Sequence, residues 1–131
     1  MPHLTLTLSH NIDVTKIGLR VLFESLHAAL DGVPGLDVAT CQSGLIQQSY
    51  SYVGFGDDKL TKVYLQFEWL DKPGRAELKP MLAERLMSVL ENILAPQITK
   101  QNLICSPRVH IGTLGVLSED YYMSKTMPLS S

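Results

Sequence analysis

Alternating apolar and polar positions open the chain and recur near its middle. In residues 3–9 (HLTLTLS) leucine occupies every second position, and residues 62–70 (KVYLQFEWL) repeat the alternation with larger side chains. A period of two is typical of a β-strand that buries one of its faces. The pattern therefore predicts two strands of the same kind, one in each half of the chain.

Each of these strands is followed by an apolar stripe with helical spacing. The first stripe predicts a helix over residues 14–31, which begins after Asp13, a suitable N-cap, and ends at a glycine and a proline. The second predicts a helix over residues 76–96. Pro80 lies near its start, where a missing N–H costs little, and we expect Pro96 to stop it.

A further extended segment follows each predicted helix. Residues 36–53 are rich in β-branched and aromatic side chains, which favour strands. Residues 102–112 predict a last strand, in which Pro107 favours a bulge or a sheet edge. The order strand, helix, strand thus occurs twice, with an offset of about sixty residues.

These repeats predict a single domain over residues 1–131. One βαβ unit covers about residues 2–53 and the other about residues 62–112, which leaves residues 113–131 as a tail. The expected class is α/β (α+β), with parallel pairing inside each unit and both helices on one face of one sheet. The other face reads as partly apolar and aromatic, so we expect a closed ring of subunits and a tail whose aromatic part packs on a neighbour.

Composition limits the classes of partner. The chain has 131 residues, a formal net charge of -2 and 11 Lys and Arg residues spread along its length, so a basic nucleic-acid footprint is absent. The apolar stretches are interrupted by charges, and the first residues lack the pattern of a signal peptide. We expect a cytoplasmic protein without nucleic-acid or membrane partners.

Cysteine and histidine positions follow no metal-binding pattern. Cys41 and Cys105 are far apart and lack a second ligand nearby, so we expect two reduced thiols in or near strands. The spacing of the histidines matches no metal motif either, and we expect no metal and no cofactor. His3 and His27 are predicted to be structural, whereas His110, in the last strand, is a candidate pocket residue.

Pro2 is the first candidate for chemistry. It begins the first predicted strand directly after the initiator Met1, whose removal would leave a secondary amine there. A free α-amino group titrates at about 8, and burial or cationic neighbours lower that pKa. Such a group is suited to general acid–base catalysis near neutral pH. Most prolines at the second position have no such role, but the place of Pro2 in a doubled βαβ chain favours it.

The opening MPHLTLTLSHNI and the pair Gly74–Arg75 before the second helix resemble the 5-carboxymethyl-2-hydroxymuconate isomerases of the tautomerase superfamily. The resemblance covers about residues 1–112. It implies a tautomerase fold like that of macrophage migration inhibitory factor, a homotrimer, and a cofactor-independent isomerase of aromatic catabolism. In that reaction Pro2 would move a proton on an unsaturated 2-oxo or 2-hydroxy acid.

The resemblance also implies roles for other residues. Arg75 stands at the family's Gly-Arg position and would hold a substrate carboxylate or a developing oxyanion. The family carries an arginine in the second strand where this chain has Gln42, which adds no charge and should bind a dicarboxylate less well. Arg108 or Arg20 would replace that charge if the fold brought either near Pro2.

Two other interpretations remain open at this stage. The same fold can serve as a non-catalytic oligomeric module that binds a small anion or a protein, and the uncharged Gln42 favours this alternative. The doubled βαβ pattern is also compatible with a ligand sensor resembling ferredoxin-like regulatory domains, which needs no free N-terminal proline.

Overall fold

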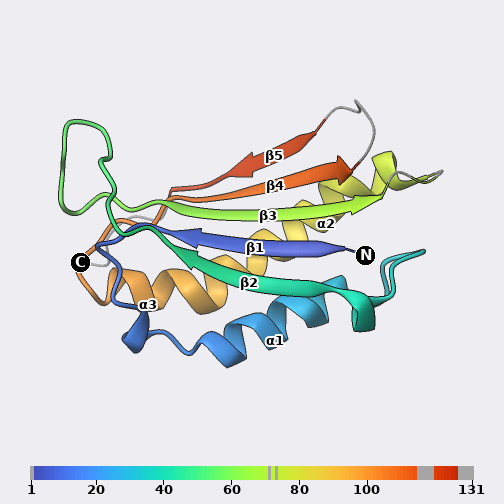
Figure 1. Ribbon diagram of the computed structural model, residues 1–131, viewed down its shortest axis with the longest axis horizontal. Coiled ribbons are helices and arrows are strands. Elements are labelled where there is room, and N and C mark those ends of the chain that lie inside the picture. The colour runs from blue at the N-terminus through green and yellow to red at the C-terminus, as the bar shows by residue number, and fades with distance from the viewer. Residues whose placement is uncertain (1, 71, 73, 115–119, 127–131) are drawn as a thin grey trace.

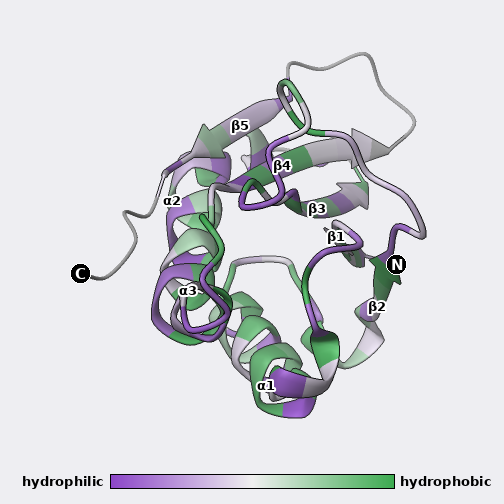
Figure 2. Ribbon diagram, turned by 90° about the vertical axis from the view of Figure 1, so that its left-hand side faces the viewer, coloured by the Kyte–Doolittle hydropathy of each residue, from purple (hydrophilic) through white to green (hydrophobic). Residues whose placement is uncertain are grey.

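One mixed sheet with helices on one side forms the molecule. The computed structural model describes residues 2–70, 72, 74–114 and 120–126. The five strands, in the order β2-β1-β3-β4-β5, are β1 (His3–Leu8), β2 (Gln42–Gln47), β3 (Val63–Leu70), β4 (Pro107–Leu114) and β5 (Tyr121–Ser124) (Figure 1). The helices are α1 (Leu19–Leu30), α2 (Arg75–Val89) and α3 (Ala95–Thr99), and they lie on the same side of the sheet (Figure 2).

Strand pairing confirms the two βαβ units. Within the first unit β1 pairs parallel with β2, and within the second β3 pairs parallel with β4. The units join through β1 and β3, which run antiparallel at the centre of the sheet with His3 opposite Glu68 and Leu8 opposite Val63. The two halves therefore have similar structures and opposite directions.

The core lies between the sheet and the helices. Alternate residues of β1 and β3 point into it, as the period of two predicts, and they meet the apolar stripes of α1 and α2. The buried side chains with less than 2 % exposure include Leu4, Leu6, Leu8, Leu22, Leu26, Leu65, Phe67, Leu82 and Leu86. Because β1 is central, its first residues are fixed by strands on both sides.

The helix boundaries differ from those expected. Asp13 does act as an N-cap, but of a short 3-10 turn (Val14–Lys16), and α1 begins only after Gly18. Pro96 does not stop the second helix, because a π-helical turn (Leu90–Leu94) follows α2 and places this proline in the first turn of α3. In a first turn the missing N–H of a proline has no intrahelical acceptor to lose.

The strands after the helices also differ from the expectation. Only Gln42–Gln47 of the predicted extended stretch forms β2, and a 3-10 turn (Val38–Thr40) precedes it. Pro107 begins β4 and does not interrupt it. The aromatic part of the tail forms β5, which pairs antiparallel with β4 of the same chain, and its packing on a neighbour stays a prediction. The final residues, expected to be loose, lie outside the described ranges.

The uncovered face of the sheet is more polar than expected. The side chains opposite the core are Thr5 and Thr7 of β1, Tyr64 and Gln66 of β3, and His110 of β4. The sequence pattern predicted a partly apolar and aromatic face, because apolar and aromatic residues occur on both sides of these strands. The structure separates these classes: Phe67 and Trp69 point into the core, while the polar side chains face outward.

Both cysteines are reduced thiols, as predicted. Cys105 is buried, and burial raises the pKa of its thiol to about 12. Cys41 lies directly before β2, and burial also raises the pKa of its thiol. Within the described ranges no helix has the length and apolar character needed to cross a membrane.

Neighbouring residues of α1 provide a test of this core. Leu22 is fully buried, whereas Val21 is 59 % exposed. Leu22→Ala is expected to lower the free energy of unfolding by about 2–5 kcal/mol, because it leaves a cavity. Val21→Ala should change it by less than about 0.5 kcal/mol. Urea denaturation followed by circular dichroism measures both, and equal effects would contradict this orientation of α1.

Candidate functional site

Pro2 lies buried at the end of the sheet where the central strand β1 begins. Its carbonyl oxygen accepts a hydrogen bond from the backbone N–H of Gln42, 3.0 Å away, which extends the pairing of β1 with β2 to the first described residue. On the other side of β1 the end of β3 supplies Trp69 and Leu70. Strands on both sides therefore fix the position of Pro2.

Arg75 packs against the same end of the sheet. It is the first residue of α2, and it follows Gly74, whose φ of 86° lies in the left-handed region that glycine adopts easily. Its Nη1 donates to the carbonyl of Leu70 at 2.5 Å and its Nη2 to the carbonyl of Gly35 at 2.7 Å. The guanidinium also lies over the Trp69 ring, 4.6 Å from its centre. The side chain is only 7 % exposed.

Pro2 and Arg75 line one pocket. It has a volume of about 160 Å³, and its walls include Pro2, Gly35, Asp37, Trp69, Lys72 and Arg75. A second hollow of about 310 Å³ shares Gly35, Lys72 and Arg75 with it. Two cationic side chains and one carboxylate belong to the described wall of the first pocket, so its charge favours a small anion.

The indole of Trp69 is an unusual part of this wall. The side chain is 1 % exposed, and its Nε1 has no hydrogen-bond partner among the described residues. Buried donors nearly always have a partner in folded proteins. Pattern reasoning assigned Trp69 to ordinary strand packing, because sequence alone does not show whether an indole N–H finds an acceptor.

The predicted site residues are not all at this pocket. Gln42 touches Pro2 through its backbone, but its side chain is exposed and is not part of the pocket wall. Arg20 is exposed and pairs with Glu24 on α1 at 2.8 Å. Arg108 lies near the beginning of β4, opposite Tyr64, whereas Pro2 lies beside the start of β2 and the end of β3. Within one chain Arg108 and Pro2 thus occupy opposite ends of the sheet.

A hydrogen-bonded chain of side chains crosses the uncovered face, and pattern reasoning found only its histidine. His110 is 9 % exposed, and its Nε2 lies 3.0 Å from Oδ2 of Asp120. Its Nδ1 lies 2.9 Å from the hydroxyl of Tyr64 and 3.3 Å from Nε2 of Gln66. The Tyr122 ring stacks on the imidazole with centres 4.3 Å apart. Asp120 and Tyr122 come from the tail, which showed no strand pattern.

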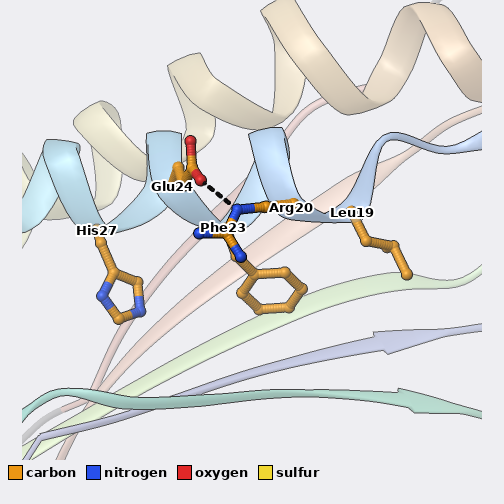
Figure 3. A pocket seen from close by; sticks show the side chains of 5 residues that line it. All are labelled: Leu19, Arg20, Phe23, Glu24 and His27. Atoms are coloured by element: carbon orange, nitrogen blue, oxygen red, sulfur yellow. Dashed lines mark ion pairs between the residues drawn. The ribbon is translucent and has the colours of Figure 1, made fainter.

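A larger hollow of about 630 Å³ runs along α1, outside both of these places. Leu19, Phe23 and His27 line it together with the ion pair of Arg20 and Glu24 (Figure 3). His27 hydrogen-bonds to Ser43 of β2, so it connects the helix to the edge strand, in keeping with its predicted structural role. This hollow contains neither Pro2 nor Arg75, and its charged groups neutralise each other. In the described part of the chain no cluster of three His, Cys, Asp or Glu side chains is placed to hold a metal.

Comparison with solved structures places this architecture among known folds. A 5-carboxymethyl-2-hydroxymuconate isomerase from Deinococcus radiodurans R1 is similar over 92 % of this chain and 90 % of that one, with a TM-score of 0.70 and 18 % identity. A 5-carboxymethyl-2-hydroxymuconate delta-isomerase gives 0.62 and 14 % identity, over 91 % and 86 % of the two chains. A macrophage migration inhibitory factor-like protein from Entamoeba histolytica gives 0.54 and 17 % identity, over 86 % and 88 %. Neither a protein-family model nor a curated protein sequence matches the chain.

Arg75 is expected to stabilise the fold as well as the pocket. Arg75→Gln removes a buried cation that donates to two carbonyls, and we expect it to lower the free energy of unfolding by about 1–3 kcal/mol. Arg75→Lys should also destabilise, because an ammonium lacks the planar fork that reaches both carbonyls. Urea denaturation checks this, with Arg85→Gln at an exposed position of α2 as the matched control. Equal stability of all three variants would show that the two bonds contribute nothing.

Proposed function

The chain has the fold of the tautomerase superfamily, and we propose that it is a cofactor-independent tautomerase acting on a small unsaturated 2-oxo or 2-hydroxy acid. The single observation that carries this proposal is the shared pocket of Pro2 and Arg75. Pro2, the candidate base, and Arg75, the cation for the substrate, come from different repeats and meet at one end of the sheet.

Pro2 would act after Met1 has been removed. Its nitrogen is then a secondary amine in a buried position beside Arg75 and Lys72. Burial and cationic neighbours both disfavour the protonated amine, so they lower its pKa toward neutrality. A neutral Pro2 takes a proton from one atom of the substrate, and the resulting prolinium returns that proton at another.

Arg75 would bind the acid and stabilise the charge that develops on it. Removing a proton next to a carbonyl places negative charge on the carbonyl oxygen. The guanidinium is held by the carbonyls of Leu70 and Gly35, so it need not reorganise when that charge appears.

The pocket favours an acid with a single anionic group. About 160 Å³ is small for a ligand site, and the adjoining 310 Å³ hollow behind Arg75 gives room for a substituent. Gln42 contributes its backbone and no charge. We therefore propose a singly charged product of aromatic breakdown, in place of the dicarboxylate that the resemblance implies.

We also propose that the active form is a homotrimer. The edge strand β2 (QSGLIQ) has no charged residue, and its Ile46 is 55 % exposed. Uncharged edge strands with free backbone groups invite pairing with another chain. The hollow along α1, with Leu19 and Phe23 in its wall, lies on the same side of the molecule as this edge (Figure 1, Figure 3). Subunits that meet at β2 and α1 would cover the apolar side chains of Ile46, Leu19 and Phe23.

A second candidate function is a non-catalytic module that binds a small anion. The observation that favours it is Gln42, because the resemblance implies an arginine there. This module would retain the charge of the Pro2 pocket but would not need a free amine on Pro2.

The decisive test is ultraviolet-monitored ketonisation of phenylenolpyruvate. The protein is first shown by intact mass to lack Met1, and its rate is compared with that of Pro2→Ala. We expect the wild type to exceed the uncatalysed rate and the variant to lose at least about a hundredfold, the usual contribution of a general base. Background rates from both proteins, here and with a panel of other enol acids, would favour the binding module.

The edge strand provides a separate test of assembly. Ile46→Lys adds a charge to β2 and is expected to convert a trimer into monomers in analytical ultracentrifugation, because a buried unpaired charge is costly. Val21→Lys, at a similarly exposed position of α1, is the matched control and should leave the assembly unchanged. A monomeric wild type would refute the trimer without affecting the chemistry proposed for Pro2.

A further inference from the structure

A separate hollow, of about 440 Å³, lies at the other end of the sheet from Pro2. It forms where the loop before β3 meets the uncovered face, and its wall includes Tyr52, Val53, Lys62, Val63, Tyr64 and Arg108. Figure 1 shows this loop extending beyond the sheet, on the side opposite the start of β1. No residue of the Pro2 pocket belongs to this wall.

The charge of this hollow is positive. Lys62 Nζ lies 5.9 Å from the centre of the Tyr64 ring, and the Arg108 guanidinium lies 5.6 Å from the same centre. None of the described wall residues is a carboxylate. Two cations on one tyrosine ring, without a carboxylate in the wall, favour an anionic ligand.

The hydroxyl of Tyr64 can donate one hydrogen bond and accept another. In the tautomer that donates from Nε2 to the Asp120 carboxylate, Nδ1 of His110 accepts the Tyr64 O–H, with the two atoms 2.9 Å apart. With its proton directed to His110, the tyrosine oxygen has two lone pairs; the Gln66 side chain takes one of them, and the other is left to accept from a ligand. Burial, chiefly, raises the pKa of Tyr64 above its usual value, so the group remains a phenol at neutral pH.

The frame around this hollow is held by its own hydrogen bonds. The buried Ser9 accepts from the backbone N–H of Lys62 at 2.9 Å, and Asn11 donates to the carbonyls of Asp58 and Leu60, both at 2.9 Å. Thr61 donates to the carbonyl of Ile104 at 2.7 Å. These bonds attach the loop to β1 and to the segment before β4, so the wall is formed without a ligand.

We propose that this hollow is a second binding site, for a small planar carboxylate that carries a hydroxyl group. Lys62 and Arg108 bind the carboxylate, the rings of Tyr52 and Tyr64 contact the planar body, and the oxygen of Tyr64 accepts the ligand hydroxyl. This gives Arg108, predicted from sequence to bind substrate, an anion to bind at its own end of the sheet. The site does not depend on the chemistry of Pro2.

The test is calorimetric titration with meta-hydroxybenzoate, benzoate and inorganic phosphate. We expect meta-hydroxybenzoate to bind more tightly than the other two. Arg108→Gln should weaken it about tenfold or more, and Lys100→Gln at the end of α3 should have no effect. Tyr64→Phe should weaken meta-hydroxybenzoate severalfold and leave benzoate nearly unchanged, because only the first ligand donates to the tyrosine oxygen.

Location and assembly are checked on the same proteins. Amide NMR shifts on titration should concentrate at residues 52–54, 61–64 and 106–110. Shifts at residues 35–40 and 69–75 would place the probe in the Pro2 pocket and overturn the proposal. Tighter binding of phosphate than of the carboxylates, an equal loss of both benzoates in Tyr64→Phe, or dissociation of the assembly by Arg108→Gln would also overturn it. Pro2→Ala, by contrast, should lose turnover and leave the binding of meta-hydroxybenzoate unchanged.

Discussion

The guanidinium of Arg75 joins the two halves of the molecule. It donates to Gly35, in the connection after α1, and to Leu70, at the end of β3, and it covers the Trp69 ring. Without this cation the carbonyls at the ends of two separate chain segments would lie together with no donor between them. The pocket beside Pro2 exists because one buried side chain satisfies both, so the same bonds shape the site and supply its charge.

The doubled topology explains why the Pro2 pocket and the hollow beside Arg108 lie so far apart. β1 and β3 run antiparallel at the centre, so the start of one repeat adjoins the end of the other. One end of the sheet collects Pro2, Trp69 and Arg75, and the other collects the loop before β3 and the start of β4. A repeat with parallel central strands would have placed the two starts side by side.

Much of this architecture could be predicted from the sequence, because it depends on local periodicity. The alternation in β1 and β3 and the stripes of α1 and α2 specify which face is buried, and Gly74–Arg75 pointed to a residue that lines the pocket beside Pro2. The chain through Asp120, His110 and Tyr64 could not be predicted, because its members meet only through the pairing of β3, β4 and β5. Pro96 was misread for a similar reason: its effect depends on the π-helical turn before it.

The central position of β1 determines when the molecule is completed during synthesis. Its neighbours β2 and β3 are both translated later, so the first strand has no partner until much of the chain has left the ribosome. Contacts between residues distant in sequence form slowly. In that interval the first residues would be accessible to a peptidase that removes an initiator methionine. Once β2 and β3 have paired with β1, Pro2 is buried, so removal of Met1 would have to precede folding.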